Sequence, residues 1–600
     1  MEVQSPTDVT IIGGGIAGSM LATVLARQNV SVRVLESGIH PQFAIGESMI
    51  PETGAWFRLM ALRYDVPELN YLSNFQGVRH HVSSACGIKR AFSYVYHRDG
   101  LPPQAAEFLQ FPTLAPPIGP DTHFFRQDLD QWMLAAALRY GAQVHQGCKI
   151  KSVARKGSGW QVRTENGLAF ESRFLIDGGG YRSPLVQLFG IREEPCRLRT
   201  NSRSIFTHMV CVRPWDDIMP LKRDMPYPFS QSTLHHVFQG GWLWVIPFNN
   251  HRESTNPLCS VGLQLDRNVH PDDSRPAQEQ FADLLAHFPG IASQFNYARP
   301  VRPWIATGRL QYSSRCTTGE GFFLLPHAAG FIDPLFSSGL GFMAWTVNNL
   351  AAALISAKAT DDWSIDRFRV IEEWTQKHFD HFDRIVSGAY VSFANFDLWN
   401  AWYRVWAIGN FHGGLGVISR CLRYLESGDC AHLTSPAAPL RGFGAADFNE
   451  YISLLDQAET QLLAFKANRV SGEDASRAIF KLIADTDFCP PQFGFGIPRR
   501  RSLGTFNFHR LQQLFWWSRS GAPKRIRDSF YGFSQVGVWK LFLTGFVKEL
   551  ARGISGISGF LHDVFVPWNR VKRMDIAVRE RGNDAHMESG LSGAPLREER

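Results

Sequence analysis

A glycine-rich segment near the N-terminus has the spacing of a nucleotide-binding turn. Gly13, Gly15 and Gly18 follow the apolar run 9–12, and a second apolar run ends at Glu36. Glycines at this spacing permit a tight turn and a close backbone approach to a pyrophosphate, and the acidic residue accepts hydrogen bonds from a ribose. The segment therefore predicts a dinucleotide site. Its expected contacts are Gly13, Gly15, Ile16, Ala17, Gly18 and Glu36.

A second candidate is the run Gly-Trp-Leu-Trp-Val-Ile-Pro at residues 241–247. Side chains two apart in a strand share a face, so Trp242, Trp244 and Ile246 would form one rigid wall. Pro247 would end the strand because it lacks a backbone donor. By pattern alone, such a run is typical of a buried core strand.

A lysine that could do chemistry lies in the apolar run 86–96, which reads as one strand. Alternation places Lys89 with small side chains and puts Phe92 on the opposite face. A lysine on a desolvated wall has a lowered pKa and becomes a strong donor or nucleophile. A lone lysine in a strand is more commonly solvated, so the pattern leaves both interpretations open.

Residues 331–339 read Phe-Ile-Asp-Pro-Leu-Phe-Ser-Ser-Gly and precede an apolar stretch. Pro334, followed by small polar residues, predicts the start of a helix. The free N–H groups at a helix start can bind an anion. A helix cap without a ligand is the alternative.

Taken together and in this order, these segments resemble the flavin-dependent halogenases, in particular the bacterial phenol halogenases, over about residues 8–410. The resemblance implies FAD as the cofactor. It also implies an α/β fold of the p-hydroxybenzoate-hydroxylase type, with a Rossmann-type FAD-binding module, an interleaved β-sheet substrate region and a helical C-terminal part. Further cofactor contacts are implied for Gly46, Glu47, Ser48, Arg126, Asp177, Asp333 and Pro334.

One departure from related flavoproteins is Pro326-His327, which stands where they carry Gly-Asp. The usual aspartate contact to the ribityl chain is therefore absent. For Arg126 and Asp177, helix-start electrostatics and a turn are the alternative explanations.

The resemblance also implies a reaction. Reduced FAD reacts with oxygen to a flavin hydroperoxide, and bound chloride, bromide or iodide attacks it to give hypohalous acid. The acid crosses to a catalytic lysine, which hydrogen-bonds it or forms a haloamine, and the substrate ring then takes the halogen. The implied residues are Ser338 and Gly339 for the halide, Trp242, Trp244, Ile246 and Pro247 for a partition between flavin and substrate, and Lys89 for catalysis. We expect a separate flavin reductase, because no second nucleotide fingerprint is present.

The predicted substrate is a phenolic small molecule. Tryptophan halogenases carry a glutamate directly after Asp-Pro-Leu, and this chain has Phe336 there. A phenol ring is already activated by its hydroxyl group and needs less assistance. Two alternatives stay open: an FAD-dependent aromatic monooxygenase, and a non-catalytic flavoprotein that acts as a binding or membrane-associated module.

The elements that must position these residues follow from the same patterns. Residues 232–247 read as a β-hairpin, because a short glycine-rich loop joins two apolar runs. Within it, His235 and His236 point to opposite faces, so we predict no metal site. Helices are expected at 345–357, 365–391 and near 448–467. The aromatic residues Phe393, Phe396, Trp399, Trp402 and Trp406 recur at helical spacing, as core or as a wall of a pocket.

The chain of 600 residues is too long for one ordinary core. We divide it into an FAD-binding module at 1–360, a helical domain at 361–490 and a basic, aromatic-rich extension at 491–600. The interleaved substrate sheet is expected at about 76–125 and 205–305. Nine cysteines without a Cys-x-x-Cys pair fit a reducing cytoplasm. Neither a signal peptide nor a membrane-spanning helix is predicted.

The extension carries the positive charge of the chain. Residues 491–600 hold 18 basic and 9 acidic side chains, whereas the whole chain has a net charge of +7. Residues 539–557 predict a basic amphipathic helix, which could lie on an anionic membrane surface but is more simply explained by docking on the protein itself. We expect no nucleic-acid partner, and disorder from about residue 582.

Overall fold

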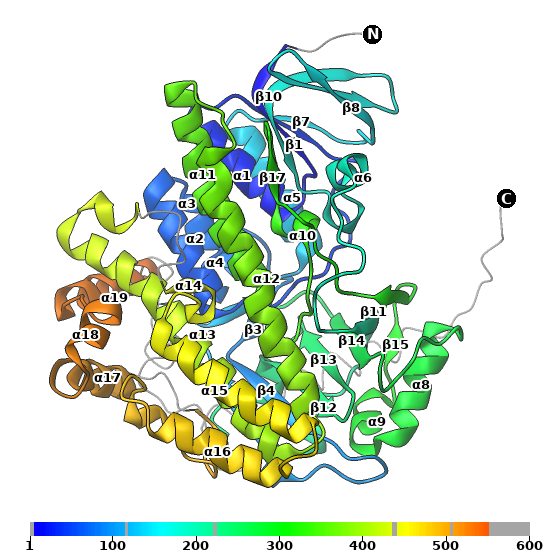
Figure 1. Cartoon of the computed structure of the whole chain (residues 1–600), viewed down its shortest axis with the longest axis vertical. Coiled ribbons are helices and arrows are strands. Elements are labelled where there is room, and N and C mark those ends of the chain that lie inside the picture. The colour runs from blue at the N-terminus through cyan, green and yellow to red at the C-terminus, as the bar shows by residue number, and fades with distance from the viewer. Residues whose placement is uncertain (1–4, 115–117, 220–224, 435–440, 504–507, 551–600) are drawn as a thin grey trace.

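The computed structural model describes residues 5–114, 118–219, 225–434, 441–503 and 508–550. Two eight-stranded sheets lie at different ends of the molecule, and long helices run along both (Figure 1). The expected disorder beyond residue 582 lies outside the described residues.

The first sheet carries the nucleotide-binding unit. Its main path has the order β17-β18-β10-β1-β2-β7, and the pairs from β18 to β7 are parallel. α1 (Ile16–Arg27) connects β1 to β2 and lies against the sheet. Its strands are β1 (Thr7–Ile12), β2 (Val32–Leu35), β7 (Gln143–His145), β8 (Ile150–Lys156), β9 (Gly159–Thr164), β10 (Ala169–Asp177), β17 (Thr318–Gly319) and β18 (Phe322–Leu324). This parallel arrangement confirms the Rossmann-type module.

The second sheet interleaves two separate parts of the chain, as expected for the substrate region. Its main path is β15-β11-β14-β13-β12-β4-β5, and β16 pairs with β11. Its strands are β4 (Ala91–Tyr96), β5 (Phe108–Pro112), β11 (Ser202–Val210), β12 (Ser232–Phe238), β13 (Gly241–Pro247), β14 (Cys259–Asp266), β15 (Arg299–Pro300) and β16 (Ile305–Arg309). β12 and β13 form the predicted hairpin.

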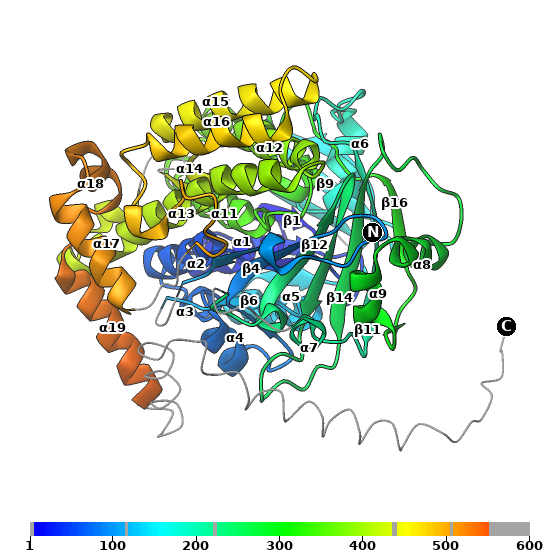
Figure 2. The same cartoon turned by 90° about the horizontal axis from the view of Figure 1, so that it is seen from below.

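The two faces of this second sheet enter different cores. Phe92, Trp242 and Trp244 belong to the main core, whereas Leu243 and Val245 belong to a smaller one with residues of α8 (Ala277–His287) and α9 (Pro289–Phe295). Figure 2 shows α13, α15 and α16 to one side of β4 and β12, with α8 and α9 on the other. The period-two alternation predicted for residues 241–247 is therefore confirmed.

The C-terminal part is helical, as predicted. Its main helices are α11 (Gly339–Thr360), α12 (Asp366–Ser392), α13 (Phe396–Ser427), α15 (Asn449–Lys466) and α16 (Gly472–Ala484). Other helices of the chain are α2 (Pro51–Tyr64), α3 (Pro67–Tyr71), α4 (Phe75–His81), α5 (Arg126–Arg139), α6 (Pro184–Phe189), α7 (Trp215–Ile218), α10 (Pro326–Ala329) and α14 (Gly442–Ala445). Buried side chains from Val9 to Phe533 form one continuous core, so the proposed domain boundaries stay a prediction.

One helix meets the length and hydropathy of a membrane span. α11 has a mean hydropathy of 1.3 over its most apolar stretch, but 78% of that stretch is buried inside the protein. Burial of this kind is typical of the central helix of a packed core.

The basic extension folds back onto the helical part. Its helices are α17 (Phe508–Ser520), α18 (Lys524–Phe530) and α19 (Gln535–Leu550). Leu541 of α19 packs beside Ile418 of α13, and Lys540 Nζ donates to the carbonyl of Leu425 at 2.9 Å. The sequence pattern puts Trp539 and Leu543 on the apolar face of this helix, but this face does not dock, because both side chains are exposed and the docked face includes Leu541 instead. Residues 551–557 of the predicted helix lie outside the described residues.

Candidate active site

Lys89 lies at the end of a short strand that turns away from the second sheet. β3 (Gly87–Lys89) pairs with β6 (Asp121–His123), and β4 begins only at Ala91. The expected single strand 86–96 is therefore wrong. The backbone N–H of Arg90 donates to the carbonyl of Gln231 at 2.7 Å and fixes the break. As a result Nζ of Lys89 lies 3.4 Å from the ring centroid of Phe92, which alternation had placed on the opposite face.

The lysine side chain is completely buried, which rules out the solvated interpretation. Its Nζ donates to Ser48 Oγ at 2.8 Å and to the carbonyl of Met49 at 2.7 Å. An ammonium has three N–H bonds, so one stays available on the side of the Phe92 ring. Burial lowers the pKa of Lys89 to about 7, against the opposing charge of Asp121.

Asp121 is the residue opposite Lys89 in the β3–β6 ladder. Burial raises the pKa of its carboxyl, and the nearby ammonium of Lys89 opposes this rise. Its Oδ2 is buried and has no hydrogen-bond partner in the part of the chain that the structure describes. Lys89 and Asp121 are thus a buried, coupled acid and base.

A directed chain of hydrogen bonds holds Ser48, the acceptor of Lys89. His123 Nδ1 lies 3.3 Å from the carbonyl of Pro247, so Nδ1 carries the proton and Nε2 accepts from Thr233 Oγ1 at 2.9 Å. Thr233 must then accept from Ser48, 2.8 Å away. Both lone pairs of Ser48 are left to accept, one of them from Lys89. The carbonyl of Pro247, at the end of the Trp-x-Trp strand, therefore orients Lys89 through this chain of hydrogen bonds.

The segment 331–339 reaches the same serine, but its helix starts later than predicted. α11 begins at Gly339 with Ser338 as its N-cap residue, and Ser337 adopts a positive φ of 53° that separates Pro334 from the helix. Ser337 Oγ donates to Ser48 Oγ at 3.2 Å. A Cβ at Gly339 would lie 3.3 Å from His327 Nε2, so the helix start is closely packed. Ser337, which directly precedes the predicted halide residues Ser338 and Gly339, is thus linked to Lys89 through the Ser48 hydroxyl.

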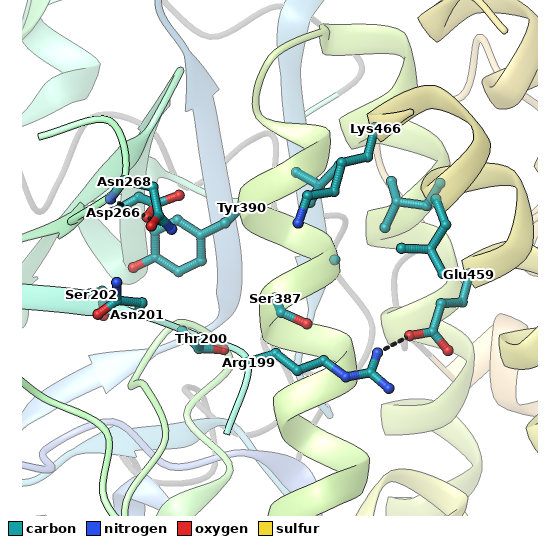
Figure 3. Close-up of a pocket in the computed structure, with 14 residues that line it drawn as sticks. Arg199, Thr200, Asn201, Ser202, Asp266, Asn268, Ser387, Tyr390, Glu459 and Lys466 are labelled. Atoms are coloured by element: carbon teal, nitrogen blue, oxygen red, sulfur yellow. Dashed lines mark hydrogen bonds and ion pairs between the residues drawn. The ribbon is translucent and has the colours of Figure 1, made fainter. Parts of the chain in front are cut away.

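Asp333 faces the other side of this segment. Its carboxylate accepts from Tyr390 OH at 2.9 Å, from Ser202 Oγ at 3.1 Å and from the N–H of Leu335 at 3.0 Å. Burial raises its pKa to about 6. Ser202 and Tyr390 also line a cavity of about 110 Å³ between α12 and α15 (Figure 3). None of the predicted site residues lines that cavity. It is connected to Asp333 through the hydrogen bonds that Ser202 and Tyr390 donate to this carboxylate.

The glycine-rich turn forms a cradle that fits a dinucleotide. A Cβ at Gly18 would lie 2.1 Å from the Gly13 carbonyl oxygen, so strand and helix touch there. Gly13 has a φ of 99°. A Cβ at Gly15 would meet only Asp130 Oδ2, at 3.8 Å, which leaves the N-terminus of α1 open on that side. Ile16 and Ala17 form the first turn of α1, whose N–H groups would face the diphosphate.

The acidic residue of the fingerprint stays ionised although it is buried. Burial by itself would raise the pKa of Glu36, but the N–H groups of Gly38 and Gly14, each 2.7 Å away, bring it below its ordinary value. The carboxylate keeps lone pairs for a ribose hydroxyl.

Of the remaining predicted cofactor residues, Arg126 and Glu47 lie beside Gly46, whereas Asp177 lies opposite Ile12, just before the glycine-rich turn. Arg126 donates to the carbonyl of Ile45 at 2.6 Å and forms a bidentate pair with Asp130 at 2.7 Å. Glu47 pairs with His208 at 2.9 Å. Asp177, at the end of β10, accepts from Ser183 Oγ at 2.6 Å and from two backbone N–H groups. Both the electrostatic and the cofactor explanations of Arg126 are compatible with this geometry.

The aromatic wall is rigid. Trp242 and Trp244 are buried with ring centroids 5.7 Å apart. Their indole N–H groups donate to Tyr390 OH and Ser260 Oγ, both at 3.2 Å. A Cβ at Gly262 would lie inside the Trp244 ring, so the neighbouring strand leaves room only for glycine. Within the described ranges, no three His, Cys, Asp or Glu side chains are placed to hold a metal ion.

Comparison with known proteins shows to which family this chain belongs. The profile of the family described as tryptophan halogenase matches residues 8–78 and 110–404. The protein belongs to the tryptophan halogenase family. Monodechloroaminopyrrolnitrin halogenase PrnC of Pseudomonas fluorescens is 42% identical over 90% of this chain and 96% of its own. Tetracycline 7-halogenase of Kitasatospora aureofaciens is 40% identical over 87% and 94%.

A solved relative shares the fold over most of the chain. The crystal structure of halogenase PltM in complex with phloroglucinol and FAD superposes with a TM-score of 0.78 at 34% identity, over 83% of this chain and 99% of that one. The protein is thus a flavin-dependent halogenase that binds FAD and acts on an aromatic substrate. The alternatives of a monooxygenase and of a non-catalytic flavoprotein are not supported. The limit of the resemblance at about residue 410 is wrong, because the relatives match most of the helical part as well.

In the halogenase, Phe336 is part of an aromatic cluster beside Lys89. Its ring stacks on Trp406 at 4.5 Å, and Trp406 meets Phe92 edge-on at 5.0 Å. Trp402 instead donates to the carbonyl of Ile385 inside the helical part. Trp402 and Trp406 are both buried in the main core, so core packing is confirmed, and a role of Trp406 as a wall of the substrate pocket stays a prediction.

Sequence reasoning missed three polar residues next to the lysine: Asp121, His123 and Thr233. Each is separated from Lys89 by at least one loop, and the pairing of β3 with β6 brings two of them in. No local signal marks them, although Asp121 and His123 lie five and three residues before Arg126, where the sequence predicts a helix start.

Replacing Asp121 by asparagine should move the pH profile of halogenation to lower pH. The carboxylate favours the ammonium form of Lys89, so its loss lowers the lysine pKa further and deprotonation occurs at lower pH. We expect the high-pH limb of product formation, followed from about pH 6 to about pH 9, to shift down by about one unit. Oxidation of reduced FAD serves as the control. An unchanged or upward-shifted limb would contradict the coupling.

Proposed function

We propose that the halogenase installs chloride, bromide or iodide on an electron-rich phenolic small molecule, with Lys89 as the catalytic residue. The observation that carries this proposal is the geometry of Lys89. The amine is completely buried, two of its donors are held by Ser48 and Met49, and aromatic rings lie on its remaining side.

In this proposal, separate residues of the chain bind the halide and separate the substrate from the cofactor. When bound in reduced form, FAD supplies the electrons with which oxygen converts a halide into hypohalous acid. Ser338 and Gly339 would hold the halide at the N-terminus of α11, which has no side-chain cap and whose first N–H groups favour an anion. The wall of Trp242 and Trp244 keeps the substrate apart from the cofactor.

Lys89 would donate its third N–H to the oxygen of hypohalous acid. This hydrogen bond makes the halogen more electrophilic and fixes it near the aromatic cluster, where a ring carbon can attack. Reduced FAD, oxygen and halide come from solution in this scheme, and a separate flavin reductase supplies the reduced cofactor.

The phenolic assignment rests on Phe336. The halogenase offers an apolar ring stacked on Trp406, where tryptophan halogenases are expected to place an acid. A substrate that needs no such acid must already be activated by its own substituent. The PltM structure contains phloroglucinol, a phenol.

Incubation with reduced FAD, oxygen and bromide tests the proposal. Phloroglucinol, resorcinols and free tryptophan would be supplied side by side, and the products read by mass spectrometry for the bromine isotope pattern. We expect bromination of the phenols. Bromination of tryptophan alone would overturn the phenolic assignment, and hydroxylated phenols without bromine would favour the monooxygenase.

A further inference from the structure

His235 lies on the aromatic face of the second sheet, between the partition and the lysine. The ladders pair it with Tyr94 on one side and with Trp244 on the other. Its ring stacks on Tyr94 at 4.5 Å and on Phe92 at 6.0 Å. The same Phe92 ring lies 3.4 Å from Nζ of Lys89, so His235 and Lys89 contact one aromatic side chain.

The hydrogen bonds of His235 leave one nitrogen unused. Its Nδ1 lies 3.2 Å from the carbonyl of Ser93, which can only accept, so Nδ1 carries the proton. Burial lowers the pKa of His235 to about 3, and the ring is therefore neutral. Nε2 is consequently a lone-pair acceptor, buried and without a partner among the described residues.

The neighbouring histidine shows what ordinary core packing looks like in this strand. His236 is equally buried but points to the opposite face, where its Nδ1 meets His97 Nε2 at 2.8 Å and its Nε2 meets Gln294 Oε1 at 2.8 Å. Buried polar groups normally find partners in this way. The free acceptor of His235 therefore needs an explanation that His236 does not.

More unpaired polar atoms surround the same place. The hydroxyl groups of Tyr94 and Tyr403 are also buried and have no partner in the described ranges, and the two ring centroids lie 5.3 Å apart. Trp399 and Trp406 complete the cluster against Tyr94. A cluster of aromatic rings with an unpaired acceptor and two unpaired hydroxyl groups suits an aromatic ligand that carries hydroxyl groups.

We infer that His235 is a substrate-contacting residue of the halogenase, whose Nε2 accepts a hydrogen bond from the ring hydroxyl of the substrate. This inference rests on the proposed function and names the substituent that the site selects: a hydroxyl group, or another group that donates a hydrogen bond to an acceptor. Methyl ethers are excluded as good substrates, because they have no proton to donate.

The contact would assist the reaction as well as binding. When a ring carbon attacks the halogen, positive charge develops on the hydroxyl oxygen, and its hydrogen bond to Nε2 becomes stronger. An interaction that is stronger in the transition state raises kcat. The hydroxyl also fixes which ring carbon faces Lys89.

The test compares a phenol with its methyl ether in the wild type and in His235→Phe, which keeps a ring in the aromatic stack. We expect kcat/KM for the phenol to fall by about 10- to 100-fold in the variant, and kcat/KM for the ether to change by less than about 3-fold. His235→Gln, whose amide oxygen can accept, should recover part of the preference. His236→Phe is the matched control and should leave the phenol-to-ether ratio unchanged.

The results distinguish a substrate contact of His235 from a packing role. An equal loss for phenol and ether in His235→Phe would show a packing role and overturn the inference, as would an unaffected phenol. If His235→Phe does not bind FAD as the wild type does, His235→Gln replaces it in the test. The ratio of kcat/KM for the phenol to kcat/KM for the ether is then compared between His235→Gln and the wild type. A wild type that halogenates neither compound would refute the proposed function instead, which keeps the two failures apart.

Discussion

Replacing Lys89 by methionine is expected to lower the rate of halogenated product at least about a thousandfold while reduced FAD is still oxidised. The lysine donates to Ser48 and Met49 and has one donor left for the reacting oxygen, and methionine removes all three. The two side chains have similar length, so the packing on Phe92 is retained. Product is measured by mass spectrometry, and flavin oxidation by absorbance.

The stability of the same variant separates chemistry from folding. Methionine avoids the desolvation cost of a buried ammonium, but it leaves Asp121 and the carbonyl of Met49 without their buried partner. We therefore expect Lys89→Met to unfold at a somewhat lower temperature than the wild type but to remain folded and to bind FAD. Lys89→Arg keeps the charge but not the size, and should also lose product. Retained halogenation by Lys89→Met would remove the lysine from the mechanism.

The second large effect is expected on stability, from replacement of Glu52 by alanine. Glu52 of α2 accepts hydrogen bonds from the N–H of Phe443, from the N–H of Gly444 at 2.9 Å and from Trp56 Nε1 at 3.2 Å. The alanine variant leaves these three buried donors without an acceptor. Each unsatisfied donor costs about 1 kcal/mol or more, so we expect a loss of about 3 kcal/mol in the free energy of unfolding.

The loss is large because Glu52 holds a strained turn. Arg441, Phe443 and Ala445 have φ values of 71°, 52° and 62°, which residues other than glycine rarely adopt. Phe443 packs from this turn onto Trp345 of α11 at 4.6 Å. Denaturant unfolding measures the change, and Glu373→Ala, an exposed glutamate on α12, is the control expected within about 0.5 kcal/mol of wild type. A Glu52→Ala protein as stable as this control would contradict the account.

Features that depend on neighbours in the chain were predictable. The turn at Gly13, Gly15 and Gly18, the hairpin that carries Trp242, and the long helices of the C-terminal part follow from local spacing and periodicity. The structure confirms all of them. In each case, short-range sterics and the side-chain period determine the element.

The helix start at Gly339 and the face of α19 were predicted less well. Pro334 favours a helix locally, but the positive φ of Ser337 delays it, and that conformation comes with the contact of Ser337 to Ser48 far away in the chain. The docking face of α19 was misassigned, because Trp539 and Leu543 are exposed and Leu541 instead packs beside Ile418 of α13.

The sequence by itself determined that this protein binds a dinucleotide and has a rigid tryptophan wall, because each feature is formed by residues that are close together in the sequence. Only the tertiary structure decided where Lys89 points and what surrounds it. The break at Arg90, the pairing with Asp121 and the free nitrogen of His235 all depend on strands that meet across long separations. The pKa of a buried amine follows from those surroundings, so its chemistry could not be read from its own strand.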